Sequence, residues 1–154
     1  QAFEPTRTQR DVTIAIEAAD DLPDILCDRP ALVDALVNLL SNAYKYGGSE
    51  RRITLLLGAN ERTVTLAVRD EGPGIAKREH RRIFEKFYRV DDLLARSQEG
   101  SGLGLAIVQH VVRAHRGRIE VDSAIGQGST FTIHLPRPRP GTARAPAVVP
   151  DGLD

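Results

Sequence analysis

Two short strand-like segments stand so close together in this chain that they can only pair antiparallel. Residues 53–57 and 64–68 are built mainly from apolar and β-branched side chains, a composition typical of strands. The connection between them, which includes Gly58-Ala59-Asn60-Glu61, is turn-sized, whereas a parallel pair needs a crossover of about a dozen residues or more. The sequence therefore predicts a β-hairpin and disfavours a doubly wound parallel sheet.

The rest of the chain mixes both kinds of periodicity. Helical spacing of apolar residues predicts two long helices, over 31–46 and 103–115. A short charged helix is also expected over 77–83. Alternation and short apolar runs predict further strands over 12–16, 25–27, 118–122 and 130–135. Because the last two flank Gly126-Gln127-Gly128, they form a second hairpin. We therefore expect an α+β two-layer sandwich, with a mixed, mostly antiparallel sheet covered by helices on one face.

Composition narrows the function classes. Lys plus Arg and Asp plus Glu both number 21 among the 154 residues, so the formal charge is zero and the basic excess of a nucleic-acid-binding protein is missing. The one cysteine, Cys27, has no partner for an internal disulfide, and no apolar run is long enough to span a membrane. We expect a domain of the reducing cytoplasm that contacts neither nucleic acid nor membrane.

The two ends of the chain differ from its middle. The sequence has no Met and opens QAFEPTRTQR, which resembles neither a natural start nor a signal peptide, so we expect a piece of a longer protein with residues 1–10 as a linker. Five of the nine prolines lie within 136–150, and we expect a disordered Pro-rich tail over 137–154. Residues 11–136 then form one domain.

The helix predicted over 31–46 carries a polar stripe. Asn38, Asn42 and Lys45 are spaced i, i+4, i+7 and share one face, with Tyr46 at its border. Asn is a poor helix former, so the stripe is either a solvated face or a site that uses amide oxygens and a positive charge. Mg²⁺ takes one or two protein oxygens together with phosphates, and such a metal-phosphate pair suits this stripe.

Asp70 ends a predicted strand and is followed by Glu71-Gly72-Pro73-Gly74. Glycines allow a backbone to approach a flat ligand closely, and the Asp70 carboxylate can accept a hydrogen bond from an exocyclic amine. The same residues are also what an ordinary turn contains. This segment alone leaves both interpretations open.

A run of glycines, Gly100-Ser101-Gly102-Leu103-Gly104-Leu105, opens the second long helix. The free N–H groups and positive dipole of a helix N-terminus form a site for anions, so a phosphate cradle is the natural hypothesis. The run is neither the dinucleotide-binding fingerprint nor a P-loop. Seven of the thirteen glycines fall in three clusters, 72/74, 100/102/104 and 126/128, and this focusing strengthens the hypothesis.

Other reactive side chains show no pattern that points to chemistry. His80, His110, His115 and His134 lack the spacing of metal ligands, and Cys27 lies in a short apolar run with no His near it in sequence to act as its base. We find no signature of covalent catalysis.

Four motifs together resemble the catalytic and ATP-binding domain of bacterial sensor histidine kinases, in the GHKL (Bergerat-fold) ATPase superfamily. In the family's order, Asn38 to Tyr46 resembles the N box, Asp70-Glu71-Gly72-Pro73-Gly74-Ile75 the G1 box, Phe84-Glu85-Lys86-Phe87-Tyr88-Arg89 the F box and Gly100 to Leu105 the G2 box. Gly126-Gln127-Gly128-Ser129-Thr130 is similar to the family's last glycine turn. The resemblance covers about residues 10–136 and is specific because all motifs occur together in order.

The resemblance implies a role in ATP binding for particular residues. At the adenine end, Asp70 receives the exocyclic amine, and the pocket is completed by Tyr46, Gly72, Gly74, Ile75 and, through a hydroxyl or a water, Thr130. At the phosphate end, Asn42 holds Mg²⁺ with help from Asn38, and Lys45 meets the phosphates. Tyr88 and Arg89 flank the sugar and terminal phosphates, residues 90–101 form a lid that includes Gly100 and Ser101, and Gly102, Leu103, Gly104 and Leu105 cradle phosphate.

The resemblance also implies a fold, partners and a reaction. The family's fold is a mixed sheet of about five strands backed by three helices. Its phosphoacceptor histidine lies in a separate dimerisation domain that nothing here matches, so we expect this domain to need that partner, in cis or in trans, and to serve a response regulator receiver domain. Asn42, Lys45 and Arg89 are the expected catalytic residues. We expect the isolated piece to be a monomer and the parent protein a homodimer.

Two other functions compete with the kinase. An ATP-driven clamp of the gyrase, mismatch-repair or chaperone branches shares the nucleotide fold, but the segment from Phe84 to Arg89 favours the histidine-kinase branch. A non-catalytic interaction module keeps the fold without the transfer activity, and the completeness of every motif argues against it.

Overall fold

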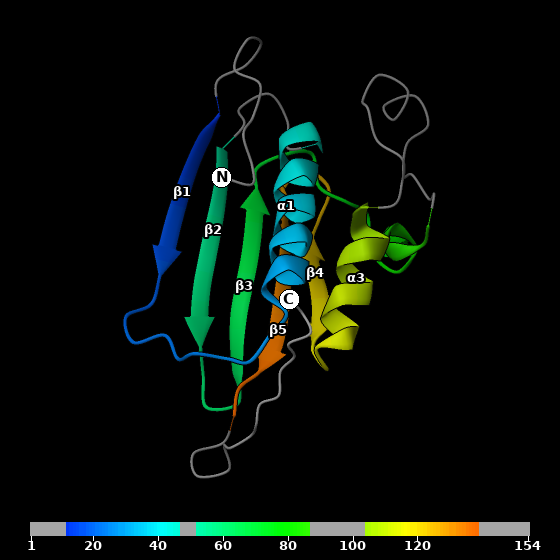
Figure 1. Ribbon diagram of the computed structural model, residues 1–154. Helices are drawn as coiled ribbons and strands as arrows, with labels where there is room; N and C mark the ends of the chain where they lie inside the picture. Colours follow the sequence, from blue (N-terminus) through cyan, green and yellow to red (C-terminus); the bar gives the residue numbers. More distant parts are fainter. Residues whose placement is uncertain (1–11, 47–51, 87–103, 139–154) are drawn as a thin grey trace.

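The computed structural model describes residues 12–46, 52–86 and 104–138 (Figure 1). These residues form a five-stranded sheet with strand order β1-β2-β3-β5-β4, two α-helices and two short 3₁₀ turns. In chain order the elements are β1 (Thr13–Ala18), α1 (Arg29–Tyr46), β2 (Arg52–Ala59), β3 (Thr63–Asp70), η1 (Lys77–Glu79), η2 (Arg82–Phe84), α3 (Gly104–Ala114), β4 (Arg118–Ser123) and β5 (Ser129–Pro136).

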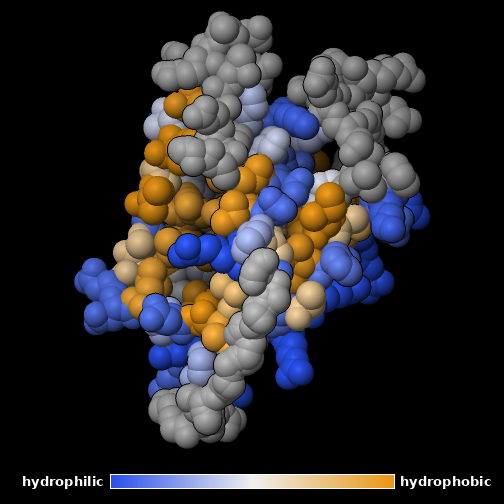
Figure 2. Space-filling model, in the orientation of Figure 1, coloured by the Kyte–Doolittle hydropathy of each residue, from blue (hydrophilic) through white to orange (hydrophobic). Residues whose placement is uncertain are grey.

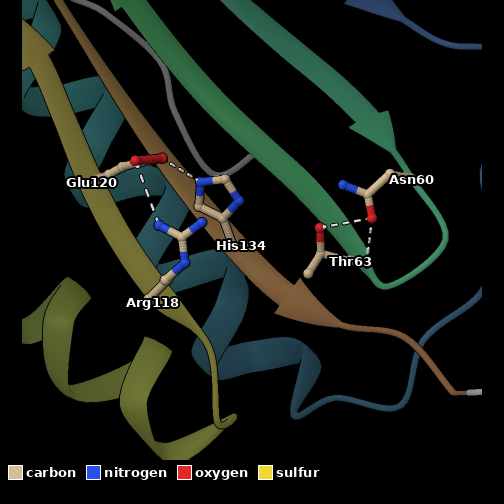
Figure 3. Close-up of polar contacts among 5 residues, drawn as sticks. All are labelled: Asn60, Thr63, Arg118, Glu120 and His134. Atoms are coloured by element: carbon tan, nitrogen blue, oxygen red, sulfur yellow. Dashed lines mark hydrogen bonds and ion pairs between the residues drawn. The ribbon is translucent and has the colours of Figure 1, made fainter.

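The sheet is mixed, because β1 runs parallel to β2 and all other neighbours are antiparallel. Helix α1 forms the crossover that a parallel pair needs. Both predicted hairpins are confirmed, as β2–β3 and β4–β5. In the first turn, Asn60 Oδ1 accepts backbone N–H bonds from Arg62 at 2.8 Å and from Thr63 at 2.9 Å, an Asx-type turn that fixes the register of the hairpin; Figure 3 shows Asn60 and Thr63.

Helices α1 and α3 cover one face of the sheet (Figure 1), which confirms the predicted two-layer α+β sandwich. Every second residue of β5, namely Phe131, Ile133 and Leu135, is buried and joins Leu39 and Val108 from the two helices in one core. Burying a large aliphatic side chain stabilises a fold by about 1.5–3 kcal/mol. The alternation of β5 therefore orients the strand, with odd-numbered residues facing the helices.

The two helices are joined at one end by hydrogen bonds around Asp28. Its side-chain Oδ1 accepts the N–H of Ala31 at 3.1 Å and caps α1. Its own N–H donates to Nε2 of His115 at 2.9 Å, while Nδ1 of that ring lies 2.9 Å from the carbonyl oxygen of Val111. His115, the residue after α3, thus accepts a hydrogen bond from the residue that caps the start of α1.

The opposite face of the sheet is polar. On β4 and β5, Nε2 of His134 lies 2.6 Å from Oε1 of Glu120, and Arg118 lies 3.5 Å from the same carboxylate (Figure 3). The hydrogen bond from His134 is the main cause that holds the pKa of Glu120 below its usual value.

Strand β1 lies at the edge of the sheet, beyond the cover of α1. All of its residues are exposed, including Ile14 at 41% and Ile16 at 65%. Figure 2 shows apolar surface over this side of the molecule. Within the described residues, no helix is long and apolar enough to cross a membrane.

Two predicted elements are wrong. Residues 25–27 form no strand, and Cys27 is exposed, because this segment belongs to the connection from β1 to α1 and pairs with no strand. The predicted helix over 77–83 is replaced by the two 3₁₀ turns. Of its residues only Ile83 is buried, so the segment has no apolar stripe that packing could turn into a longer helix.

Candidate functional site

A row of polar side chains crosses the sheet at one end of its strands. The register pairs Asp70 of β3 with Ser129 of β5, and Ser129 in turn with Ser123 of β4. Asp70 and Ser129 are 8% and 6% exposed. Because side chains on a strand alternate between faces, this row shares the helix-covered face with the buried Val68 and Phe131 of the next row. The polar row thus lies directly beside the apolar core, on the same face of the sheet, and we call it the polar wall.

Asp70 is a buried carboxylate held mainly by the backbone. Its Oδ1 accepts the N–H of Gly72 at 2.9 Å, and the backbone of Ser129 also bonds the carboxylate. Burial raises the pKa of Asp70, while these two hydrogen bonds partly offset that rise and neighbouring Glu71 adds to it. A carboxylate whose burial outweighs its bonds gains from a further donor, such as the N–H of a ligand.

The loop after Asp70 is fastened to the turn between β4 and β5. The N–H of Ile75 donates to Ser123 Oγ at 2.7 Å, and the N–H of Gly126 donates to the carbonyl oxygen of Pro73 at 2.6 Å. These bonds bring the two glycine clusters 72/74 and 126/128 together.

Glycine is required at two positions of this contact. Gly74 and Gly128 have φ of 81° and 75°, a region that L side chains rarely adopt. A Cβ at Gly74 would lie 2.0 Å from the backbone oxygen of Ala124, and one at Gly128 would lie 2.2 Å from that of Asp70. The wall therefore depends on two backbones that approach each other without side chains between them.

Helix α1 supplies a second group of site residues. Asn38, Asn42, Lys45 and Tyr46 are all half-buried on the last turns of this helix. Nδ2 of Asn38 donates to the carbonyl oxygen of Asp34 at 3.0 Å, and Oδ1 of Asn38 would lie 3.1 Å from a Cβ added at Gly104. The structure therefore brings the first residue of α3 against the polar stripe of α1, with Leu105 packed on the core behind it.

The group of residues that could hold a metal is small. Within the described ranges, no three His, Cys, Asp or Glu side chains gather as a metal site. The amide oxygens of Asn38 and Asn42 remain the hard donors that suit Mg²⁺. They lie one helical turn apart on α1, and Asn38 lies beside Gly104, the first residue of α3.

The third predicted motif is anchored by its first residue. The rings of Phe84 and Phe131 meet edge to face, with centroids 6.3 Å apart, next to buried Ile83. The other predicted site residues of this part of the chain lie outside the described residues: Tyr88, Arg89, Gly100, Ser101, Gly102 and Leu103.

Strand register places Thr130, a predicted site residue, away from Asp70. It pairs with Arg69 and Asp122, and alternation places all three on the opposite, polar face of the sheet. Ser129 takes the place next to Asp70. Sequence reasoning missed Ser129 and Ser123, although one signal was present: the apolar Phe131 must face the core, and residue 129 shares its face.

Comparison with known proteins gives a consistent family. Residues 27–139 match the family described as "Histidine kinase-, DNA gyrase B-, and HSP90-like ATPase". The sensor-like histidine kinase SenX3 of Mycobacterium tuberculosis is 44% identical over 124 residues, which are 79% of this chain and 30% of that protein. The sensor histidine kinase WalK of Bacillus subtilis is 39% identical over 140 residues, covering 87% and 22%. The chain thus spans about a third or less of these relatives.

Solved structures agree with the sequence relatives. The mycobacterial sensor histidine kinase MprB superposes with a TM-score of 0.71 at 35% identity, over 82% of this chain and 85% of that one. Full-length ShkA in complex with AMPPNP superposes with a TM-score of 0.68 at 35% identity, over 80% and 25%. Both similarities extend over most of the present chain.

Proposed function

Because the chain belongs to the family of histidine kinase-, DNA gyrase B- and HSP90-like ATPases, we propose that it is the ATP-binding catalytic domain of a sensor histidine kinase. In this proposal it donates the γ-phosphoryl group of ATP to a histidine on a separate dimerisation domain. The observation that carries the proposal is the buried carboxylate of Asp70, which ends β3 on the face covered by α1 and α3. The relatives named as sensor histidine kinases support the same branch.

At the base end, the Asp70 carboxylate accepts a hydrogen bond from the exocyclic amine of adenine. Gly72, Gly74 and Ile75 shape the pocket because their loop is tied to the β4–β5 turn. Tyr46, half-buried at the end of α1, lies against the base. Ser129 replaces Thr130 as the hydroxyl next to Asp70.

At the phosphate end, Lys45 and Arg89 balance the negative charge, and the segment from Gly100 to Leu105 cradles the phosphates at the N-terminus of α3. Asn42 and Asn38 would hold Mg²⁺ through their amide oxygens. Two such donors fit a metal that keeps most of its waters. When bound, the ion neutralises phosphate charge. Asn42, Lys45 and Arg89 are the proposed catalytic residues.

The nucleophile comes from outside these residues. Three of the four histidines are engaged within the fold: His80 with the carbonyl oxygen of Ile75, His115 with Asp28 and Val111, and His134 with Glu120. We propose that the phosphoacceptor lies on the parent protein's dimerisation domain, reached in cis or in trans, and that a response regulator receiver domain then takes the phosphoryl group.

Further organisation follows from the same proposal. In this proposal residues 11–136 form the domain, 1–10 a linker and 137–154 a tail, and residues 1–11 and 139–154 lie outside the described residues. Arg137, the first residue of that tail, still bonds to the β2–β3 turn: its N–H donates to the carbonyl oxygen of Arg62 and its guanidinium to that of Asn60. The domain works in the cytoplasm, on its own or as the inner part of a membrane-bound sensor, and the parent protein is a homodimer.

Phosphoryl transfer tests the proposed function. The chain is mixed with ATP labelled on its γ-phosphate and with the histidine-containing domain of its own full-length protein. We expect acid-labile, alkali-stable label on that domain, as phosphohistidine requires. ATP hydrolysis that rises with dimerisation, without labelled histidine, would instead assign the chain to the clamp branch, and binding without either reaction would make it an interaction module.

A further inference from the structure

We propose that Ser123 is a positioning residue that fixes the direction of the Ser129 hydroxyl, so that Ser129 offers only lone pairs to the base and the site selects an exocyclic amine over a carbonyl. The inference rests on the proposed function, since it concerns the base of the bound nucleotide. It concerns the chain's own hydroxyl groups on β4 and β5 and adds a residue that no sequence motif had singled out.

Ser123 Oγ lies at the centre of three short contacts. It accepts the N–H of Ile75 at 2.7 Å and donates to the carbonyl oxygen of Gly128 at 2.8 Å. Its third contact is with Ser129 Oγ, also at 2.8 Å. All three distances are those of good hydrogen bonds.

Counting protons assigns a direction to the third bond. A serine hydroxyl has one hydrogen and two acceptor lone pairs. The Gly128 carbonyl can only accept, so it takes the one Ser123 hydrogen. Both lone pairs of Ser123 then face donors, the N–H of Ile75 and the hydroxyl of Ser129. The Ser129 hydrogen is therefore used inside the protein.

This direction decides what Ser129 presents to a ligand. Ser129 is the register partner of Asp70 on the same face of the sheet, so a base that reaches the carboxylate also comes to this hydroxyl. An ionised carboxylate has no hydrogen to donate, and neither has a Ser129 whose proton faces Ser123. Adenine, with two amine hydrogens at position 6, satisfies two such acceptors, whereas a carbonyl oxygen at that position is repelled by both.

A purely structural role is the competing account. Ser123 also fastens the loop of residues 72–75 to the β4–β5 turn, through Ile75 and Gly128. Loss of that fastening would weaken the binding of every nucleotide to a similar extent. The proposed role changes the preference between bases, so the ratio of two affinities separates the accounts.

The experiment measures dissociation constants of ATP and ITP, which differ only at position 6 and the adjoining ring nitrogen. Calorimetry or fluorescence competition is used with the wild-type chain, Ser123→Ala and Ser123→Thr. We expect wild-type protein to prefer ATP. In Ser123→Ala, the freed Ser129 hydroxyl can rotate and donate to the ITP carbonyl, so the preference falls by about tenfold, the value of one hydrogen bond. Ser123→Thr keeps a hydroxyl and restores the preference.

A double-mutant comparison tests whether Ser123 acts through Ser129. Ser129→Ala removes the acceptor, and adding Ser123→Ala to it should leave the ATP-to-ITP ratio unchanged. Thr132→Ala, a hydroxyl removed from the opposite face of β5, is the matched control and should keep the wild-type ratio. If Ser123→Ala does not fold, Ser123→Cys offers a weaker donor of similar size and should lower the preference in the same direction.

The outcomes separate this inference from the proposed function. A wild-type chain that binds neither nucleotide overturns the proposed function and the inference together. In another outcome, the wild-type chain binds ATP while Ser123→Ala or Ser123→Cys keeps the wild-type ratio of ATP to ITP affinity. That result leaves the proposed function intact and overturns the inference, because Ser123 then only holds the loop of residues 72–75 to the β4–β5 turn.

Discussion

The two walls of the candidate site are built in different ways. The sheet wall, defined here as Asp70, Ser123 and Ser129, is set by strand register and by short hydrogen bonds to the backbone. The helix wall, defined as Asn38, Asn42 and Lys45, consists of half-buried side chains on the polar stripe of α1. The sheet wall is held by hydrogen bonds within the protein, whereas we propose that the amides and ammonium of the helix wall serve groups that the ligand brings.

This difference separates recognition from chemistry. A change in the sheet wall should weaken all adenine nucleotides alike, because the base is common to them. A change in the helix wall should act on the phosphates and the metal, and thus on transfer. The predictions below test this division.

The largest effect is expected in the helix wall. Asn42→Ala removes the amide oxygen that we assign to Mg²⁺, and phosphoryl transfer should fall by about a hundredfold or more, the range for loss of one preorganised electrostatic group. ADP binding measured without Mg²⁺ should hardly change, which serves as the internal control. Transfer at the wild-type rate would remove Asn42 from the metal site.

In the sheet wall, the backbone contact at Gly128 can be broken with a closely matched control. Gly128→Ala places a Cβ 2.2 Å from the Asp70 backbone oxygen, at a φ of 75°, and should lower the free energy of unfolding by about 2–4 kcal/mol through strain and overpacking. Gly126→Ala has a similar φ of 83° but meets nothing within 4 Å, so only the strain of about 1 kcal/mol applies. Urea unfolding gives both values, and equal losses would mean that the contact is unimportant.

Adjacent residues of β5 sharpen the comparison between the two faces of the sheet. Ser129→Ala should weaken ATP binding by about three- to tenfold, because the base loses one hydrogen-bond acceptor. Thr130→Ala, one residue later on the opposite face, should leave the ATP dissociation constant unchanged. The reverse result in a competition assay would mean that Thr130 faces the base.

The smallest effect concerns pH and stability. Burial raises the pKa of Asp70, so the folded chain binds this proton more tightly than the unfolded chain does. By linkage, the contribution of Asp70 to stability is greatest below the ordinary carboxyl pKa and declines as pH rises through the raised one. The difference in unfolding free energy between wild-type protein and Asp70→Asn should therefore decline across that window. A difference that grows with pH would contradict the raised pKa.

The local elements of the fold could be predicted from the sequence. Helix 31–46 and the two hairpins follow from residue spacing and turn-sized connections, which act within a few residues. The strand predicted at 25–27 failed because three apolar residues form a strand only beside a partner. The parallel pairing of β1 with β2 and the order β1-β2-β3-β5-β4 depend on contacts between distant segments, for which this sequence carries no local signal.

The candidate site was predictable to a similar degree. Asp70 and the α1 amides stand out because their residue types are unusual for their positions. The structure places Asp70 at the end of β3 and Asn38 beside the first residue of α3. Ser129 and Ser123 are common residues in a strand and gain meaning only from the register that aligns them with Asp70. The glycines at 74 and 128 were visible as clusters, but the backbone contacts that require them were not.

The most direct test of the central claim is the dissociation constant of ATP for the wild-type chain and for Asp70→Ala, measured by calorimetry with Mg²⁺ present. Arg69→Ala, an exposed neighbour on the opposite face of β3, serves as the control. The account predicts that Asp70→Ala weakens binding by about ten- to a hundredfold, the value of 1–3 kcal/mol for a buried amine left unpaired, and that Arg69→Ala does not. Unchanged affinity in Asp70→Ala would contradict the placement of the base on the sheet wall.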